Sequence, residues 1–370
     1  MWENIRVIED MTSIAGTTHV LIVDNENTVW AAGNNQNLQL GRDDKTTCLK
    51  AVQGLPPIKL AAAGWEHSLF LDFEGNMWAC GSNKRGEWGM PFSEQEEAAG
   101  ILKIATTFVA KSIACGCNHS YILDVDGCVW SCGNNGYGQL GSGEKSKRNF
   151  YSFCKVVSLP PIKSVYTLGN FGYFLDNEGC AWAVGLNSYG QLGTGDKKSI
   201  ESPRKITNLP PIQTIACGGN HTLLLDYSGV VWTCGVNFHS KPGHQVVVPD
   251  KIENVPEVVA ISCGWYHCMM LDVDGCVWVF GKNDQSQLGL ESKVQQIQPM
   301  KLTNLPKIQQ IYCGWYHSMF VDYECNVWVC GEIKKDLGLG VGYEPEQIPS
   351  LTVLGFAKGK QTKSARFTLN

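Results

Sequence analysis

Apolar residues occur along most of this chain in short paired runs, and a polar turn separates the two members of each pair. One representative pair is His221–Asp226 and Val230–Cys234, joined by the turn Asp226-Tyr227-Ser228-Gly229. Asp at the first position and Gly at the fourth are typical of a type I turn, and the runs are rich in residues that favour strands. Because apolar residues fill consecutive rather than alternate positions, we expect sheets that are covered on both faces.

Two further strands complete the predicted unit. The I-x-C-G segment before each pair predicts one strand, and the segment around Pro203–Ile206, before Leu209-Pro210-Pro211, predicts another. The unit occurs seven times. Its V-W tryptophan recurs at spacings of 46 to 52 residues, at Trp30, Trp78, Trp130, Trp182, Trp232, Trp278 and Trp328. The histidine of its G-x-x-H motif recurs at His19, His67, His119, His221, His267 and His317, and Phe171 takes its place in the fourth copy.

Four strands in about fifty residues, repeated seven times, predict an all-β fold, a seven-bladed β-propeller with four-stranded blades. Apolar residues three apart precede the first copy and also follow the last. We therefore expect the N- and C-terminal strands to pair and close the ring. The predicted propeller domain covers residues 1–356, and residues 357–370 form a basic tail that we expect to be flexible.

One string of residues carries a resemblance to a known family. The pattern G-x-x-H-[ST]-x-x-L-D-x-x-G-x-V-W-x-x-G-x-N-x-x-G-Q-L-G is fullest at Gly116–Gly141 and Gly264–Gly289, and it resembles the regulator of chromosome condensation repeat. The resemblance covers nearly the whole chain and also implies a seven-bladed propeller. Because some family members are nucleotide exchange factors for the small GTPase Ran, it implies a GTPase as a possible partner. A more distant relative is the plant UV-B photoreceptor, which implies a light-sensing alternative.

Composition and charge narrow the choice of partners. The 370-residue chain has a formal net charge of −5 and a pI of about 5.9, so nothing in its overall charge attracts nucleic acid, and we expect none. No stretch is long and apolar enough to span a bilayer. The sixteen cysteines mostly share repeat positions with small apolar residues, which favours a reduced protein in the cytoplasm or nucleus. We expect a monomer.

The repeated residues predict structural roles rather than chemistry. Each G-x-x-H histidine is expected to be a partly buried imidazole that bonds backbone at a blade corner, and each V-W tryptophan is expected to pack within its blade. The glycine-rich runs lack the G-x-x-x-x-G-K-[ST] pattern of a phosphate loop. We therefore predict no catalytic residues, no cofactor and no metal site.

The two residues between Gly and His vary from copy to copy and provide the candidate site. We call these two residues the tip of each loop. The tips are small or polar in copies three to five and aromatic in copies six, seven and two. Ring closure makes copies six, seven, one and two neighbours, so the aromatic tips are expected to lie on one half of one face. The predicted partner-binding residues are Trp65, Glu66, Trp265, Tyr266, Trp315 and Tyr316. Exposed Trp and Tyr are enriched in binding hot spots, so binding of a protein partner is the favoured interpretation. The alternative is that the rings lie flat and plug the central channel.

The tips also distinguish the functions that the resemblance implies. Exchange factors of the family use acidic and histidine residues at these tips together with a protruding β-wedge. Here Glu66 is the one acidic tip residue, and no repeat is long enough to contain a long wedge. The photoreceptor has G-W-R-H-T tips, but Glu66, Tyr266 and Tyr316 stand where its arginines would be. A non-catalytic interaction propeller is therefore the main hypothesis, with nucleotide exchange second and light sensing third. The sequence leaves open whether the chain is part of a larger protein.

Overall fold

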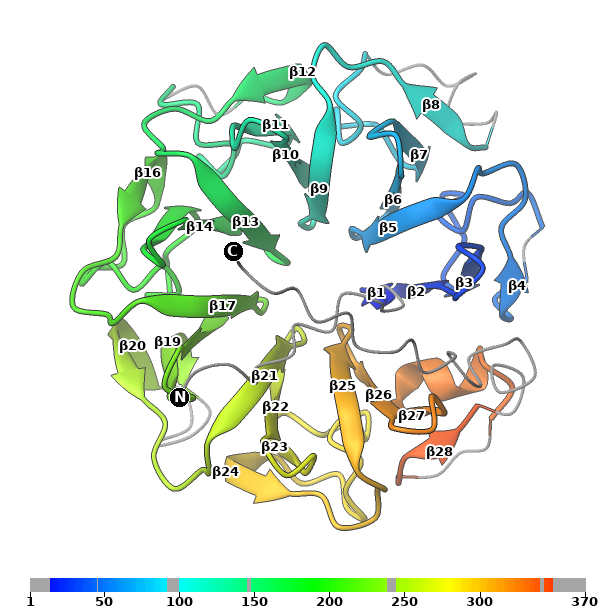
Figure 1. The fold of residues 1–370 in the computed structure, drawn as a ribbon, viewed down its shortest axis with the longest axis vertical. Helices are drawn as coiled ribbons and strands as arrows, with labels where there is room; N and C mark the ends of the chain where they lie inside the picture. The colour runs from blue at the N-terminus through cyan, green and yellow to red at the C-terminus, as the bar shows by residue number, and fades with distance from the viewer. Residues whose placement is uncertain are drawn as a thin grey trace, which may run out of the picture.

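Seven four-stranded antiparallel sheets surround a central axis in the computed structural model of this chain (Figure 1). The structure describes residues 14–44, 46–91, 100–144, 148–237, 244–339 and 343–348. Each sheet is made of four strands that are consecutive in the sequence. The predicted seven-bladed propeller with four-stranded blades is therefore confirmed.

Each blade presents its strands in the same order from the axis outward. The first, innermost strands are β1 (Ile14–Gly16), β5 (Ile58–Ala63), β9 (Ala110–Cys115), β13 (Ile162–Thr167), β17 (Ile212–Cys217), β21 (Val258–Cys263) and β25 (Ile308–Cys313). The second strands are β2 (His19–Val23), β6 (His67–Asp72), β10 (His119–Asp124), β14 (Phe171–Asp176), β18 (His221–Asp226), β22 (His267–Asp272) and β26 (His317–Asp322). The third strands are β3 (Val29–Gly33), β7 (Met77–Gly81), β11 (Val129–Gly133), β15 (Ala181–Gly185), β19 (Val231–Asn237), β23 (Val277–Gly281) and β27 (Val327–Gly331). The outer strands are β4 (Lys50–Ala51), β8 (Leu102–Ile104), β12 (Phe150–Lys155), β16 (Ile200–Lys205), β20 (His244–Lys251), β24 (Gln296–Lys301) and β28 (Glu346–Gln347).

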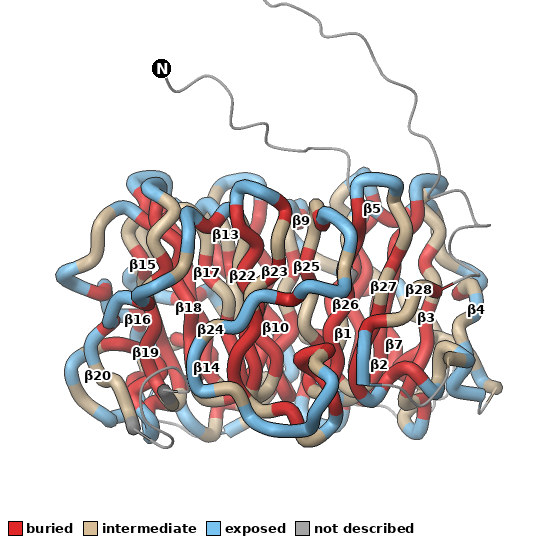
Figure 2. The backbone as a smooth tube through the Cα atoms, turned by 90° about the horizontal axis from the view of Figure 1, so that it is seen from below, coloured by how far each residue is buried: buried red, intermediate tan, exposed pale blue. Residues whose placement is uncertain are grey.

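The second strand of each blade is buried along its whole length, which explains its run of consecutive apolar residues. All residues of β6, β10, β14, β18, β22 and β26 are buried, because a neighbouring blade covers each face of their sheet. In the side view, the strands run between the two faces of the disc, and exposed residues gather in the loops at those faces (Figure 2). The core is therefore a ring of apolar contacts between adjacent blades.

The turn aspartate explains the fixed spacing between the D-x-x-G turn and the V-W tryptophan. In the fifth blade, Asp226 Oδ1 accepts hydrogen bonds from the N–H groups of Ser228 and Val230, at 2.8 and 3.1 Å. Its Oδ2 accepts one from the indole N–H of Trp232 at 2.9 Å. All seven blades have this Asp–Trp bond, at 2.7 to 3.4 Å. Each tryptophan therefore holds the turn that precedes it.

The ring closes through packing between the first and seventh blades. Val20 and Ile22 of β2 share one apolar cluster with Met319 and Val321 of β26. The sequence suggested that strands from the two chain ends pair in one sheet. Among the described strands, β1 belongs to the first sheet and β28 to the seventh, and these two sheets pack against each other. Segments 1–13 and 349–370, which supply most of the predicted closing strands and the basic tail, lie outside the described residues.

Helix is nearly absent from the part of the chain that the structure describes. A single short 3₁₀ segment, η1 (Glu332–Lys335), follows β27, and no described helix has the length and apolarity needed to cross a membrane. All sixteen cysteines are free thiols.

Candidate partner-binding face

The six G-x-x-H loops and the equivalent loop of the fourth blade meet around the axis on one face of the propeller. Each loop joins the first strand of a blade to the second, and its first tip residue contacts the loop of the next blade. At five of the seven junctions, the N–H of this residue donates to the tip carbonyl of the next blade, at 3.0 to 3.3 Å. These bonds run from Trp65 to Cys117, Cys117 to Gly169, Gly219 to Trp265, Trp265 to Trp315 and Trp315 to Thr17. The predicted common face therefore exists, and a ring of backbone hydrogen bonds stabilises it.

Three tip tryptophans come together on this face. The rings of Trp65 and Trp315 lie 5.4 Å apart, and those of Trp315 and Trp265 lie 4.4 Å apart, measured between centroids. We call Trp65, Trp265 and Trp315 the tryptophan cluster. The Trp65–Trp315 contact joins the second and seventh blades, so it depends on closure of the ring, as the sequence suggested.

The three tryptophans differ in exposure, which the sequence did not predict. Trp65 is 41 % exposed, Trp265 is partly buried, and Trp315 is only 7 % exposed. Trp315 and Trp265 pack against the central apolar cluster that includes Cys117 and Leu168. The binding interpretation assumed exposed rings, and Trp315 does not meet that assumption, because it is a buried member of this cluster. Its indole N–H is buried without an acceptor among the described residues.

The remaining predicted residues line the edge of the tryptophan cluster. Tyr266 and Tyr316 are partly exposed and meet Trp265 and Trp315 edge to face, at 6.1 and 6.4 Å. The ammonium of Lys282 lies 5.4 Å from the Tyr266 ring centroid. Burial raises the pKa of Tyr316. Glu66 is partly buried beside Trp65 in the chain.

Two hollows flank the tryptophan cluster. The larger, of about 740 Å³, lies at the junction of the seventh and first blades, and we call it the junction pocket. Its lining includes Trp315, Tyr316 and three carboxylates, those of Asp43, Glu332 and Asp336. The smaller hollow, of about 390 Å³, lies between Trp65, Arg85 and polar residues of the third and fourth blades. Aromatic rings, an acidic pocket and a polar pocket therefore share one face.

The repeated histidines hold neighbouring blades together. Nε2 of His19, His67 and His267 lies 2.7 to 3.0 Å from the serine hydroxyl of the next blade, Ser68, Ser120 or Ser318. These hydroxyls donate in turn to backbone carbonyls, for example Ser68 to Gln39, so they accept from the imidazoles. The bonding partner of each Nε2 is a side chain of the adjacent blade, whereas the sequence suggested the backbone.

Burial keeps these imidazoles neutral. It lowers the pKa of His19, His67, His119 and His267 to about 3 and that of His317 to about 4. A charged imidazole would lose its hydration in this environment, so the neutral form is favoured. Such histidines do not titrate near pH 7 and are unsuited to acid–base catalysis.

The histidine–serine contact between blades is lost or altered where the G-x-x-H-[ST] sequence is altered. Phe171 replaces the histidine of the fourth blade, and the hydroxyl of Thr222 in the fifth blade donates only to the carbonyl of Gln191, at 3.0 Å. At the junction of the third and fourth blades, His119 meets Thr167 at 3.2 Å. At the junction of the fifth and sixth blades, His221 meets Cys268 at 3.1 Å.

Comparison with known proteins gives the same family for both halves of the chain. The RCC1-like domain family matches residues 4–258, and the regulator of chromosome condensation (RCC1) repeat matches residues 258–287 and 274–321. The chain is 33% identical over 88 residues to the regulator of chromosome condensation of Xenopus laevis, covering 24% of this chain and 20% of that protein. It is 29% identical over 214 residues to the human probable E3 ubiquitin-protein ligase HERC4, covering 54% of this chain and 20% of that protein. These matches span about a fifth of each relative's length.

The ultraviolet-B receptor UVR8 of Arabidopsis thaliana is also similar, with 27% identity over 195 residues, 51% of this chain and 44% of the receptor. Among solved structures, human WBSCR16 superposes with a TM-score of 0.76 at 24% identity, covering 88% of each chain. Yeast RCC1 (Prp20), solved bound to Kap60, superposes with a TM-score of 0.77 at 22% identity, covering 90% of this chain and 84% of its own. The two structural likenesses extend over most of the propeller and support the fold.

Proposed function

Because this chain belongs to the RCC1-like domain family, we propose that it is a non-catalytic propeller that binds a protein partner through the face carrying the G-x-x-H loops. Nothing in this role requires covalent chemistry. A location in the cytoplasm or the nucleus is part of this proposal, because many of the cysteines occupy positions that other repeats fill with small residues.

One observation carries this proposal: Trp65 is 41 % exposed and its ring packs at a tilt against the buried Trp315. An exposed indole held rigidly by a buried one loses little conformational entropy on binding, and tryptophan is among the residues most enriched in hot spots. The buried indole N–H of Trp315 lacks an acceptor among the described residues, and an unsatisfied buried donor is destabilising. A partner that reached it with a carbonyl oxygen would remove that penalty.

The junction pocket supports a partner with a basic side chain. Asp43, Glu332 and Asp336 line it, and Tyr316 forms part of its aromatic wall. An Arg or Lys entering this pocket would gain charge-assisted hydrogen bonds together with a contact to the ring. Partner specificity would then come from the pocket, and affinity mainly from Trp65.

Trp65→Ala tests the proposal. We expect a partner to bind the variant at least about 30-fold more weakly, because truncation of a hot-spot tryptophan costs about 2 kcal/mol or more. The thermal midpoint should fall only slightly, because Trp65 is 41 % exposed and is not a member of the central apolar cluster. Affinity capture followed by titration of the captured protein measures the first effect, and differential scanning calorimetry measures the second.

Phe73→Ala is the matched control. Phe73 is 61 % exposed in the D-x-x-G turn of the same blade, at the opposite end of β6 from the G-x-x-H loop. The turns on that opposite face also expose Val125, Tyr227, Val273 and Tyr323. If Phe73→Ala abolished binding while Trp65→Ala did not, the partner would use that other face and the proposal would fail.

Nucleotide exchange on a small GTPase is the second candidate function. Family membership favours it, and a yeast neighbour of the same fold, Prp20p, has been studied for its binding to Gsp1p and histones. The assay mixes the protein with Ran and other small GTPases that carry fluorescent GDP, and follows loss of the fluorophore. Faster release in any of these reactions would establish exchange. Binding to a GTPase with no change in release would leave the interaction role alone.

The similarity to the ultraviolet-B receptor gives a third test. Tyr266 and Tyr316 stand where that resemblance implies arginine, so we expect no charge-held dimer. Gel filtration before and after UV-B illumination should give the same elution volume, and a shift would favour light sensing.

A further inference from the structure

We propose that His221, Cys263 and Cys268 form a binding site for a thiophilic cation of the Zn²⁺ class, buried between the fifth and sixth blades. Within the part of the chain that the structure describes, these three residues are the one His/Cys/carboxylate group whose ligand atoms all lie within 4.8 Å of one another. The proposal is independent of the partner-binding face.

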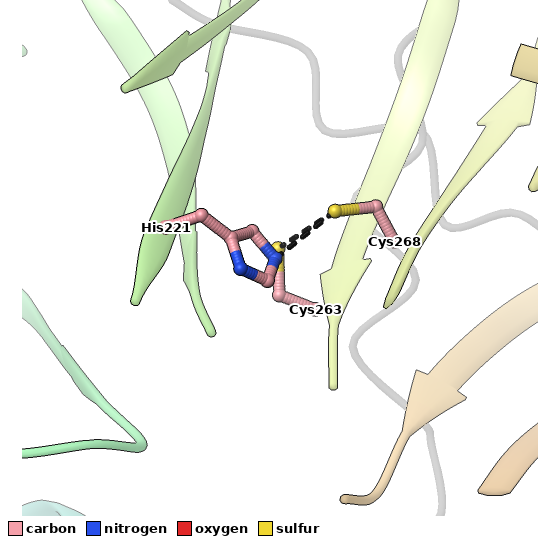
Figure 3. Close-up of side chains that lie close together, drawn as sticks. All are labelled: His221, Cys263 and Cys268. Atoms are coloured by element: carbon pink, nitrogen blue, oxygen red, sulfur yellow. Dashed lines mark hydrogen bonds between the residues drawn. The ribbon is translucent and has the colours of Figure 1, made fainter. Parts of the chain in front are cut away.

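Three strands of two blades supply the three side chains. His221 is the first residue of β18 in the fifth blade, whereas Cys263 ends β21 and Cys268 is the second residue of β22 in the sixth. Cys263 and Cys268 are directly opposite each other in the antiparallel ladder, so their side chains lie on the same face. The imidazole of His221 comes from the neighbouring blade and points at both sulfur atoms (Figure 3).

The separations between the ligand atoms suit a tetrahedral metal. The two Sγ atoms lie 3.9 Å apart, and Cys268 Sγ lies 3.1 Å from His221 Nε2. Zn–S bonds of about 2.3 Å and Zn–N bonds of about 2.0 Å place tetrahedral ligand atoms roughly 3.5 to 3.8 Å apart. The third separation, between the His221 nitrogen and Cys263 Sγ, is within 4.8 Å. Small side-chain rotations would therefore bring all three atoms to bonding distance.

The charge and chemistry of the group also favour this cation. Two thiolates would neutralise a divalent ion in a fully buried place, which offsets the loss of hydration. Thiolate and imidazole ligands together select zinc-like ions over magnesium or calcium. Cys263 lines the central channel, a cavity of about 490 Å³, which provides a route of entry and room for water as a fourth ligand.

Comparison with another junction of the same propeller separates this group from the ordinary blade contact. Between the second and third blades, His67 Nε2 lies 3.0 Å from Ser120 Oγ, and Cys115 Sγ lies 4.0 Å from the same oxygen. The geometry is nearly the same, but a neutral hydroxyl replaces one thiol. The fold therefore places a histidine, a cysteine and a third side chain close together at both junctions. Between the fifth and sixth blades the third side chain is Cys268, where the other junction has Ser, and this cysteine completes the ligand set.

A bound ion would join two blades. It would hold β18 against β21 and β22, and Trp265 of the tryptophan cluster follows Cys263 by two residues. The metal–ligand bonds would then hold the fifth and sixth blades together more strongly than hydrogen bonds hold the other pairs of blades.

Titration of the full-length, metal-stripped and reduced protein with Co²⁺ tests the proposal. We expect one equivalent to bind, with the intense visible bands of a tetrahedral cobalt site and a sulfur-to-cobalt charge-transfer band in the near ultraviolet. Zn²⁺ should displace the cobalt and abolish both signals. Zn²⁺ should also raise the thermal midpoint, because a ligand that binds only the folded state stabilises it.

Two variants serve as matched tests. Cys268→Ser reproduces the histidine–hydroxyl pair of other junctions, so it should fold, bind Co²⁺ roughly 100-fold more weakly and lose much of the charge-transfer band, because one of few ligands is gone. Cys115→Ser removes the equivalent of Cys263 at the junction of the second and third blades and should leave the titration unchanged. Conversely, Ser120→Cys should create a second site with His67 and Cys115 and raise the stoichiometry to two.

Three outcomes would overturn the proposal. The first is a Co²⁺ spectrum without a sulfur band. The second is equal affinity in the wild type and in Cys268→Ser. The third is a thiol titration of the unreduced protein, unfolded in the presence of a chelator, that finds two fewer reactive groups than sixteen, with the loss mapped to Cys263 and Cys268; this would indicate a disulfide in place of a metal site.

Discussion

Glu87 provides the sharpest test of how this propeller is stabilised. It occupies the position of the glutamine in the G-Q-L-G motif, which is Gln39, Gln139, Gln191 and Gln287 in other repeats. Its side chain is only 2 % exposed, and one of its carboxylate oxygens, Oε2, accepts a hydrogen bond from the N–H of Arg85 at 2.8 Å. The glutamines accept the equivalent bond through Oε1, for example from the N–H of Tyr189 to Gln191 at 2.9 Å. Glu87→Gln therefore preserves shape and hydrogen bonding while it removes a buried charge.

The magnitude follows from the pKa of this carboxyl. Burial raises the pKa of Glu87 from 4.5 to about 7, against smaller opposing contributions from backbone hydrogen bonds and Arg85. Below pH 4.5 the group is protonated in both folded and unfolded protein, so it carries no penalty. As the pH rises from about 4.5 to about 7, the unfolded chain ionises first and stability is lost. Each pKa unit corresponds to about 1.4 kcal/mol, so the loss at pH 8 is about 3 kcal/mol.

We therefore expect Glu87→Gln to raise the free energy of unfolding by about 3 kcal/mol at pH 8 and to leave it nearly unchanged at pH 4.5. Urea unfolding, followed by tryptophan fluorescence at several pH values, measures this difference. The reciprocal variant is Gln191→Glu. The Nε2 group of Gln191 is buried without a partner among the described residues, so the substitution removes no amide hydrogen bond there. It should destabilise the protein at pH 8 and have little effect at pH 4.5.

A gain that is the same at all pH values would refute this reasoning, because it would mean that packing, and not ionisation, separates the two side chains. Equal stability of the wild type and Glu87→Gln at pH 8 would show that the carboxylate is hydrated in the folded protein.

The remaining predictions concern the turns and the close approaches of the backbone. Asp226→Ala should lower the free energy of unfolding by about 2 kcal/mol, because two backbone N–H groups and the indole N–H of Trp232 lose their acceptor. Urea unfolding measures this loss, and Asp226→Asn should recover part of it. Burial acts to raise the pKa of Asp272, but the hydrogen bonds to its carboxylate outweigh burial, and the pKa is lowered. The stability that this carboxylate contributes should therefore be complete above about pH 4 and should fall as the pH drops further. Acid unfolding followed by circular dichroism measures this loss. Gly281→Ala should cost about 2 kcal/mol or more, since the glycine has φ 106° and an added Cβ would lie 2.5 Å from the carbonyl oxygen of Tyr266; an unchanged thermal midpoint would contradict this.

Sequence alone was sufficient for the architecture. The repeat, the two apolar runs and the D-x-x-G turn are local patterns, and each strand pair depends on residues fewer than about fifty positions apart. The strands β17, β18 and β19 accordingly lie where the pattern of the fifth repeat predicts them. The predicted strand around Pro203–Ile206 is β16, which is the outer strand of the fourth blade and not part of the fifth. The turn aspartate was quoted in the motif, but its bond to the tryptophan was missed. The constant separation of six residues between the two would have revealed it.

Only the tertiary structure could rank the residues of the candidate site. Trp65, Trp265 and Trp315 occupy the same position in their repeats, yet one is exposed and one is buried. Their environment depends on rings that arrive from other blades across the axis, and sequence separation contains no information about that convergence. The motif histidines are a similar case, because their partners lie 47 to 53 residues away in the next blade.

The group formed by His221, Cys263 and Cys268 also depends partly on the sequence and partly on the tertiary structure. The sequence contains a visible signal, since Cys268 stands where several other copies have Ser or Thr, but Cys also replaces small residues at many positions of this chain. The closed ring is what brings a histidine of one blade to within 3.1 Å of a thiol of the next. Periodicity determined what each blade is, because a blade is built from its own segment of chain. The contacts between blades decided which side chains are available for binding, because those contacts exist only once all seven sheets surround one axis.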